Sequence, residues 1–429
     1  MKRRLSTTPG AYRPGAATHS PRVAAQLAER RESFRARWKR DPGRELSLLL
    51  ILAAALLTIG VGAVAARTMT FAALDRDADS TFWMESAQRF RYVRMIEAGE
   101  PLPAMDARMQ APDGYPPRQD TVLQEELLGR LARLRPPDES VAAAVRRWTR
   151  LLATSAVLPL ALLAWAVTRR RDAALLAAFV FSLTLPVVER GNGSVLFRED
   201  LAFPVLLWHL ALLARFARSP TWINAFLAGV ALAAALLLWK VVQFHALLVV
   251  ALLFGAFVLR RASDREVVRG AIGLFLPAVC ASFLPANLRY EQFATSAPVL
   301  GAAAIAVGAG LAPLRASRPR WVWVVLMAAL FGGARLALPH EAGFDHAWET
   351  ISAKIRTLDH KPADPSLLSF HARHYWTGNY ESPSLLRLLR DWSLLALLAL
   401  PGAVVLARSL PRPTAAPILR PPPRKLLEG

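Results

Sequence analysis

The sequence lacks the usual features of a soluble enzyme driven by ATP, NAD or thiol chemistry. Its 429 residues include one cysteine, Cys280, so no disulfide can form within the chain, and we expect Cys280 to be a small core residue. There is no Walker A sequence, no G-x-G-x-x-G after a strand, no G-x-S-x-G and no C-x-x-C. Only 20% of residues are charged and 54% are hydrophobic, which excludes a simple soluble enzyme.

Among the charged residues, the positively charged ones are in strong excess. There are 53 Lys and Arg residues against 32 Asp and Glu residues, which gives a formal net charge of +21. Such an excess is typical of proteins that bind nucleic acid, but a soluble nucleic-acid-binding domain does not carry many long apolar runs. Lys and Arg also gather in the cytoplasmic loops of membrane proteins. We therefore expect the partner to be a lipid bilayer and not nucleic acid.

The long apolar runs predict an all-α polytopic membrane protein with about ten transmembrane helices. A helix needs about 20 apolar residues to cross the hydrocarbon core, and residues 46–66 contain no charge at all. Three of the runs (201–214, 321–334 and 393–407) are short and need their flanks to cross. The predicted spans are residues 46–66, 151–168, 173–188, 201–214, 221–239, 241–259, 270–288, 292–314, 321–334 and 393–407.

The basic residues predict which side of the membrane each loop occupies. Residues 1–45 carry 12 Lys and Arg against 4 Asp and Glu, which places the N-terminus in the cytoplasm. If the spans alternate, every short basic loop and the C-terminus fall on that side. The domains are then a disordered basic arm (1–45), a membrane domain (46–408) and a proline-rich tail (409–429). The abundant Ala, Leu and Arg suggest a bacterial plasma (inner) membrane.

The first predicted outer loop, residues 67–150, contains an acidic cluster. Asp75, Asp77 and Asp79 follow a hydrophobic helix, where charges are unfavourable unless they are paired, hydrated or bound to a ligand. The alternative is that they cap a helix and face water. Residues 82–97 and 122–134 predict amphipathic helices lying along the membrane interface.

The second outer loop contains Gly191-Asn192-Gly193, which predicts a tight turn, followed by Arg198, Glu199 and Asp200 at the start of a span. Carboxylates from different loops that converge on one face can serve as a general base or bind a divalent ion. If a metal is used, we expect Asp79, Glu199 and Asp200 to bind Mg²⁺ or Mn²⁺. The alternative is an Arg198–Asp200 ion pair at the helix end.

The third outer loop, residues 338–391, is rich in cations and aromatic residues. Lys and Arg bind phosphate oxygens, and aromatic faces stack on sugar rings. No two histidines have the spacing of a zinc-binding helix. The loop therefore suits an anionic lipid substrate, and its candidate contacts are His346, Lys354, His371, Arg373, Tyr375 and Trp376.

Five segments resemble the tryptophan C-mannosyltransferases, which belong to the GT-C class of membrane glycosyltransferases. The stretch FWMESAQRFRYVRMIEAG (82–99) resembles the segment that carries their proposed catalytic carboxylate, which corresponds to Glu85. LFREDLAFPVLLWH (196–209) is similar to their Arg-Glu-Ser-Phe-Ala-Tyr-Pro stretch, with Asp200 in place of Ser. LWKVVQFHALL (238–248) resembles a further span, and residues 346–355 and 370–375 resemble their late lumenal loop.

The same region also resembles the catalytic subunit of oligosaccharyltransferase. RDADSTFW (76–83), followed by GEPLPAMD (99–106) and PDGYP (112–116), looks like its first loop. On this resemblance Asp79 binds the divalent ion and the acceptor amide, and Glu199 and Asp200 form the second-loop acidic pair. The sequence departs from that family in lacking a W-W-D-Y-G motif and a large C-terminal soluble domain.

These resemblances imply an inverting GT-C glycosyltransferase that takes its sugar from a polyprenyl-phosphate or diphosphate donor. Glu85, Asp79 or Asp77 would act as base or orient the acceptor, which is a protein or a glycan. Arg198, Lys354, His371 and Arg373 would stabilise the leaving phosphate, with Tyr375, Trp376 and His346 as further substrate contacts. The alternative is a non-catalytic membrane protein, either a transporter or an envelope-assembly scaffold.

Overall fold

The computed structural model describes residues 41–74, 79, 82, 84–109, 114–117, 121–283, 292–312 and 319–338, with 352, 353, 355, 356 and 364. The chain divides into two compact units, residues 1–342 and 343–429. In the second unit, residues 352–353 and 355–356 are helical. The predicted span 393–407 lies outside the described residues, as do seven of the predicted site residues. They are Asp77, His346, Lys354, His371, Arg373, Tyr375 and Trp376.

The regular secondary structure described in the first unit is helical, and the described residues contain no β-strand beyond an isolated bridge between Asp106 and Tyr115. The all-α prediction is confirmed over this part. The α-helices are α2 (Pro42–Ala73), α3 (Met84–Ala98), α4 (Leu123–Ala132), α5 (Val141–Thr154), α6 (Val157–Thr168), α7 (Arg171–Leu183), α8 (Leu185–Arg190), α9 (Glu199–Arg218), α10 (Trp222–Leu238), α11 (Val242–Val258), α12 (Asp264–Ala281), α14 (Ala297–Leu311) and α15 (Arg320–Ala337), with a 3₁₀ turn η2 at Phe293–Thr295.

Several helices begin where the sequence supplies a side-chain cap. Asp41 accepts the backbone N–H of Arg44 at 2.9 Å, and Pro42 occupies the first helical turn of α2. Ser263 and Glu266 form a reciprocal capping box at the start of α12. These caps satisfy backbone N–H groups that the first turn of a helix leaves without partners.

Among the described residues, four helical segments are long and apolar enough to cross a membrane: α2, α5 with α6 (Val141–Thr168), α9 and α15. The helices α10, α11 and α14 are apolar but shorter. Nine of the ten predicted ranges overlap helices among the described residues, whereas the count of ten spans stays a prediction.

The first helix continues beyond its predicted apolar run. Residues 46–66 lie within α2. The helix continues through Arg67 and ends at Ala73. The Arg67 side chain is buried, and its guanidinium donates to the carbonyl oxygens of Ala63 at 3.1 Å and Val187 at 3.5 Å. A charged residue can remain in a helix interior when its donors find carbonyl partners.

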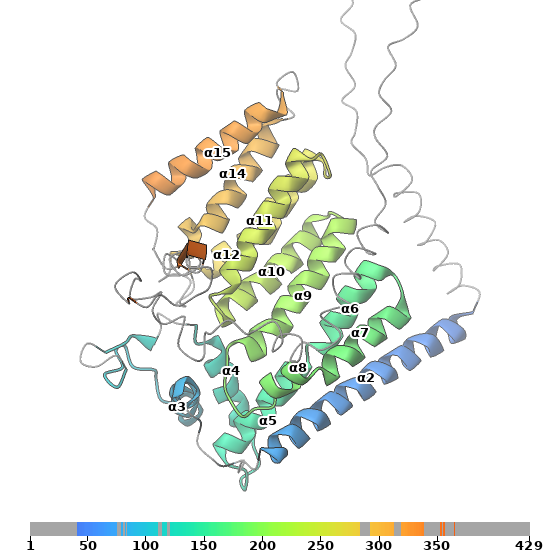
Figure 1. The fold of residues 1–429 in the computed structure, drawn as a ribbon, viewed down its shortest axis with the longest axis vertical. Coiled ribbons are helices and arrows are strands. Elements are labelled where there is room, and N and C mark those ends of the chain that lie inside the picture. The colour runs from blue at the N-terminus through green and yellow to red at the C-terminus, as the bar shows by residue number, and fades with distance from the viewer. Residues whose placement is uncertain are drawn as a thin grey trace, which may run out of the picture. The chain divides into compact units, whose positions relative to one another are not determined.

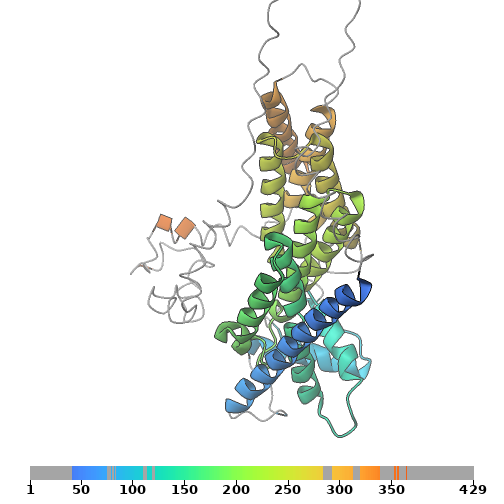
Figure 2. The ribbon, with the colours of Figure 1, turned by 90° about the vertical axis from the view of Figure 1, so that its right-hand side faces the viewer.

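Helices α9, α10, α12, α14 and α15 pack in sequence, each against the next (Figure 1). In Figure 2, α2 is inclined to these helices and packs mainly against α7, α5 and α8. The contact between α10 and α12 depends on Gly229 and Gly273. A Cβ atom on Gly229 would lie 2.4 Å from the Gly273 carbonyl oxygen, so glycine allows the backbones to approach closely.

Two predictions about individual segments have different outcomes. The amphipathic segments 82–97 and 122–134 coincide with α3 and α4, within a few residues at each end. The expectation that Cys280 is a core residue is wrong, because Cys280 is exposed. The hydrophobic pattern of α12 cannot distinguish a residue packed against a neighbouring helix from one on its outer face, since both are apolar in a membrane protein.

Candidate functional site

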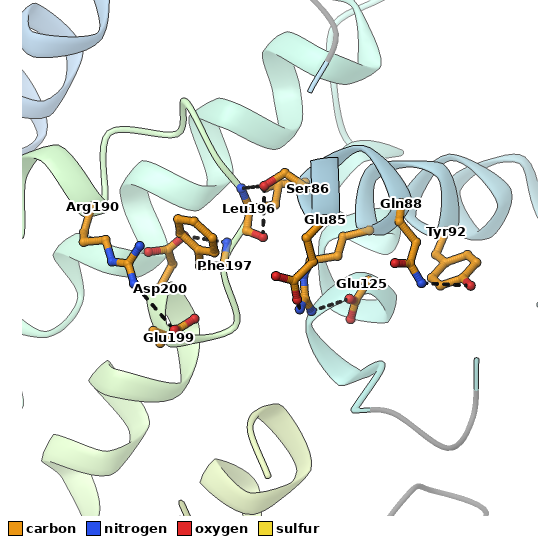
Figure 3. Close-up of polar contacts among 11 residues, drawn as sticks. Glu85, Ser86, Gln88, Tyr92, Glu125, Arg190, Leu196, Phe197, Glu199 and Asp200 are labelled. Atoms are coloured by element: carbon orange, nitrogen blue, oxygen red, sulfur yellow. Dashed lines mark hydrogen bonds and ion pairs between the residues drawn. The ribbon is translucent and has the colours of Figure 1, made fainter. Parts of the chain in front are cut away.

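A pair of hydrogen bonds holds α3 against the loop that precedes α9 (Figure 3). The buried Ser86 hydroxyl accepts the backbone N–H of Leu196 at 2.9 Å and donates to the Leu196 carbonyl at 3.4 Å. Leu196 also packs in an apolar cluster with Phe82, Val93 and Leu128. The first and second predicted outer loops therefore meet at one end of the helical bundle.

The tight turn predicted at residues 191–193 is present, and α5 supports it. Gly193 has a φ of +81°, and a Cβ atom there would lie 2.8 Å from the Arg146 carbonyl oxygen. The buried Arg146 side chain donates to the Gly193 carbonyl at 2.9 Å and lies 4.0 Å from the centre of the Phe82 ring. The Asn192 side chain accepts the Ser194 N–H at 2.8 Å. This loop is thus held on both sides, by α3 and by α5.

Glu199 and Asp200 occupy the first turn of α9, where the helix dipole favours negative charge. Asp200 is buried and accepts the N–H of Phe197 at 3.1 Å, so it holds the chain that enters the helix. The Glu199 side chain is 35% exposed and lies 3.6 Å from the Arg190 guanidinium. Arg67 and Arg190 are both close enough to attract Asp200 electrostatically.

The sequence reasoning missed Arg190, which lies at the end of α8. Its guanidinium is 4.2 Å from the centre of the Phe197 ring in addition to its contact with Glu199. Its position directly before the Gly-Asn-Gly turn is the one signal in the sequence that it shares this loop. Arg198, which was predicted as a phosphate contact, directly precedes α9. Two arginines therefore flank the carboxylates of α9.

Glu85 lies in the first turn of α3, and its side chain is 59% exposed. It forms an ion pair with Arg89, one helical turn further on. The Arg89 side chain is buried and also lies 3.2 Å from Glu125 of α4, whose side chain is only 2% exposed. Arg89 and Glu125 were not predicted as partners. Glu85 is thus the outward member of a group of three charges (Figure 3).

Asp79 lies beside the start of α5. It accepts a hydrogen bond from the hydroxyl of Ser140, and this hydroxyl caps α5 by accepting the Ala143 N–H at 3.1 Å. Asp79 therefore reaches a helix N-terminus, in line with the capping alternative.

The carboxylates expected to bind a metal contact other side chains where the structure describes them. Within the residues that the structure describes, no three His, Cys, Asp or Glu side chains gather closely enough to hold a metal ion. Asp79 is bound to Ser140, whereas Glu199 faces Arg190. Mg²⁺ and Mn²⁺ take several oxygen ligands at short range, so metal binding by Asp79, Glu199 and Asp200 stays a prediction.

Comparison with known proteins finds similarity in structure and not in sequence. No protein-family model matches the chain, and no curated protein matches it. The structure is similar to the crystal structure of the Archaeoglobus fulgidus oligosaccharyltransferase in the apo form, with a TM-score of 0.59 and 15% sequence identity. The match covers 83% of this chain and 45% of that protein, so the chain spans less than half of its length. The chain therefore has an oligosaccharyltransferase-like fold of the GT-C type.

Proposed function

We propose that this protein is a membrane glycosyltransferase. It moves a sugar from a polyprenyl-phosphate or diphosphate donor to a protein or glycan acceptor on the non-cytoplasmic face of a bacterial plasma membrane. The proposal is supported chiefly by the meeting of the Glu85 segment with the Glu199–Asp200 segment in an oligosaccharyltransferase-like bundle. The Ser86–Leu196 contact joins the two segments directly.

On the acceptor side, Glu85 has the exposure that a substrate contact needs. Arg89 binds the Glu85 carboxylate from the protein side, and the remaining lone pairs can accept a hydrogen bond from an acceptor N–H or O–H. The acceptor atom attacks the anomeric carbon and its proton passes to the carboxylate or to water. Asp79 is the second candidate for this role, at the N-terminus of α5.

On the donor side, the bond between the anomeric carbon and the phosphate oxygen breaks, and the electron pair stays on the phosphate. Guanidinium groups stabilise this growing negative charge by charge-assisted hydrogen bonds. Arg190 has an exposed side chain beside Glu199, and Arg198 lies at the same helix start. On sequence grounds we assign further phosphate and sugar contacts to Lys354, His371, Arg373, Tyr375, Trp376 and His346.

The proposal is tested by transfer of radiolabelled sugar from polyprenyl-phosphate and diphosphate donors in membranes. We expect the Glu85→Gln, Asp79→Asn double variant to lose activity by about 100-fold or more, the contribution typical of a positioned acid–base group. Glu126→Gln is the matched control, because Glu126 forms a surface ion pair with Arg130, at 3.3 Å. Equal activity in the wild type and the double variant would refute the assigned roles.

Two further outcomes distinguish the alternatives. If the wild type transfers no sugar from any donor, the non-catalytic interpretation is favoured. If EDTA abolishes transfer, the oligosaccharyltransferase-like chemistry with Mg²⁺ or Mn²⁺ is favoured, whereas survival favours the C-mannosyltransferase-like chemistry.

A further inference from the structure

A second feature lies at the other end of the bundle. Helix α10 spans about 25 Å, and its last residue, Leu238, packs with Leu201 close to the carboxylates of α9. Its first residue, Trp222, therefore marks the end remote from the candidate active site. A groove with a volume of about 510 Å³ lies there, between the start of α10, the start of α12 and the end of α14.

The charge in this groove is positive and only partly compensated. Arg265 and Arg269 are one turn apart on α12, so both lie on the face that lines the groove. Asp264 also lines it but is bound to Arg320 at 2.6 Å. Arg269 donates from Nη1 to the carbonyl of Pro220 at 3.0 Å. Arg265 is exposed and makes no hydrogen bond or ion pair with any residue that the structure describes.

The rest of the groove is apolar. Val268 of α12 faces Ala309 and Gly310 of α14, and among the described residues a Cβ atom on Gly310 would meet only the Val268 side chain, at 3.9 Å. The neighbouring Ile223 is 71% exposed. Trp222 is 49% exposed and lines the groove. Tryptophan is enriched at membrane–water interfaces because its ring is apolar and its N–H is polar.

We propose that this groove binds an anionic phospholipid. The phosphate headgroup lies on Arg265 and Arg269, Trp222 lies at the level of the headgroup, and the upper acyl carbons follow Val268 and Gly310. The combination of arginines with an apolar wall carries this assignment, because a free phosphate gains nothing from the hydrocarbon surface. The site is independent of the proposed glycosyl transfer, since it lies at the opposite end of α10.

The test is native mass spectrometry of the full chain in detergent, titrated with phosphatidylglycerol and, separately, with phosphatidylcholine. We expect tighter binding of phosphatidylglycerol. Arg265→Gln should weaken that binding about fivefold, the effect of one arginine near an anionic lipid. Gly310→Leu fills the groove without changing its charge and should also weaken binding. The control is Arg170→Gln, because Arg170 is an exposed arginine already paired with Asp172.

Three results would overturn the proposal. They are equal affinity for the two lipids, wild-type affinity in both groove variants, and full displacement of phosphatidylglycerol by inorganic phosphate at equal concentration. The last result would indicate a free-phosphate site. Thermal melting without added lipid checks the fold of each variant, and the two groove variants test charge and shape separately.

Discussion

Replacement of Arg89 tests whether the charged group at the start of α3 is structural, catalytic or both. The Arg89 and Glu125 side chains are 7% and 2% exposed, and their nearest atoms are 3.2 Å apart. At an effective dielectric constant of ~20 their attraction is about 5 kcal/mol. Removal of one member of such a buried pair destabilises a protein by about 3–5 kcal/mol. We therefore expect Arg89→Met to be strongly destabilising.

Glu85, the exposed member of the same group, contributes less to stability. The Glu85 side chain is 59% exposed, so its ion pair with Arg89 contributes about 0.5 kcal/mol or less. Glu85→Gln should leave stability nearly unchanged while it lowers sugar transfer. The double variant Arg89→Met, Glu125→Leu removes both buried charges and should recover most of the stability lost in Arg89→Met.

The assay is thermal melting of the purified full chain in detergent. At ~2 °C per kcal/mol, Arg89→Met should lower the melting temperature by about 6–10 °C. Glu85→Gln should melt close to the wild type, and the double variant should melt above Arg89→Met. If Arg89→Met melts like the wild type, or if the double variant melts lower still, the buried ion pair does not have the role described here.

Two further variants test the packing that positions the site. Gly229→Leu should prevent the close contact of α10 with α12, because its Cβ would lie 2.4 Å from the backbone oxygen of Gly273, and should sharply reduce the yield of folded protein. Gly255→Leu, with no atom within 4 Å of its Cβ, is the control and should fold normally. Ser86→Ala leaves the Leu196 N–H without its acceptor, and should lower stability by about 1–3 kcal/mol and reduce sugar transfer; unchanged melting and activity would contradict this role.

The helices and the turn of the site were predictable from local sequence. Apolar runs predict helices because backbone N–H and C=O groups in hydrocarbon must bond within the segment. The Gly-Asn-Gly turn was predictable because glycine readily adopts a positive φ that other residues avoid. Gly193 has such a φ in the structure. Glu199 and Asp200 were predictable as carboxylates at a helix start.

The partners of these residues were not predictable in the same way. Arg89 and Glu125 are 36 residues apart, and only the packing of α3 on α4 brings them together. The expected grouping of Asp79 with Glu199 and Asp200 assumed that acids on one membrane face converge. Asp79 binds the hydroxyl that caps α5, a contact that the sequence pattern does not indicate. A sequence pattern predicts which element a residue occupies, but not which surface of a distant element will meet it.

The contact between Ser86 and Leu196 also has a consequence for biosynthesis. The two residues are 110 positions apart, and a ribosome adding about 5–20 residues per second needs about 5–20 s to pass from one to the other. During that interval α3 has been made, but the loop that accepts it has not. The contact between α3 and this loop can therefore form only after Leu196 has been synthesised.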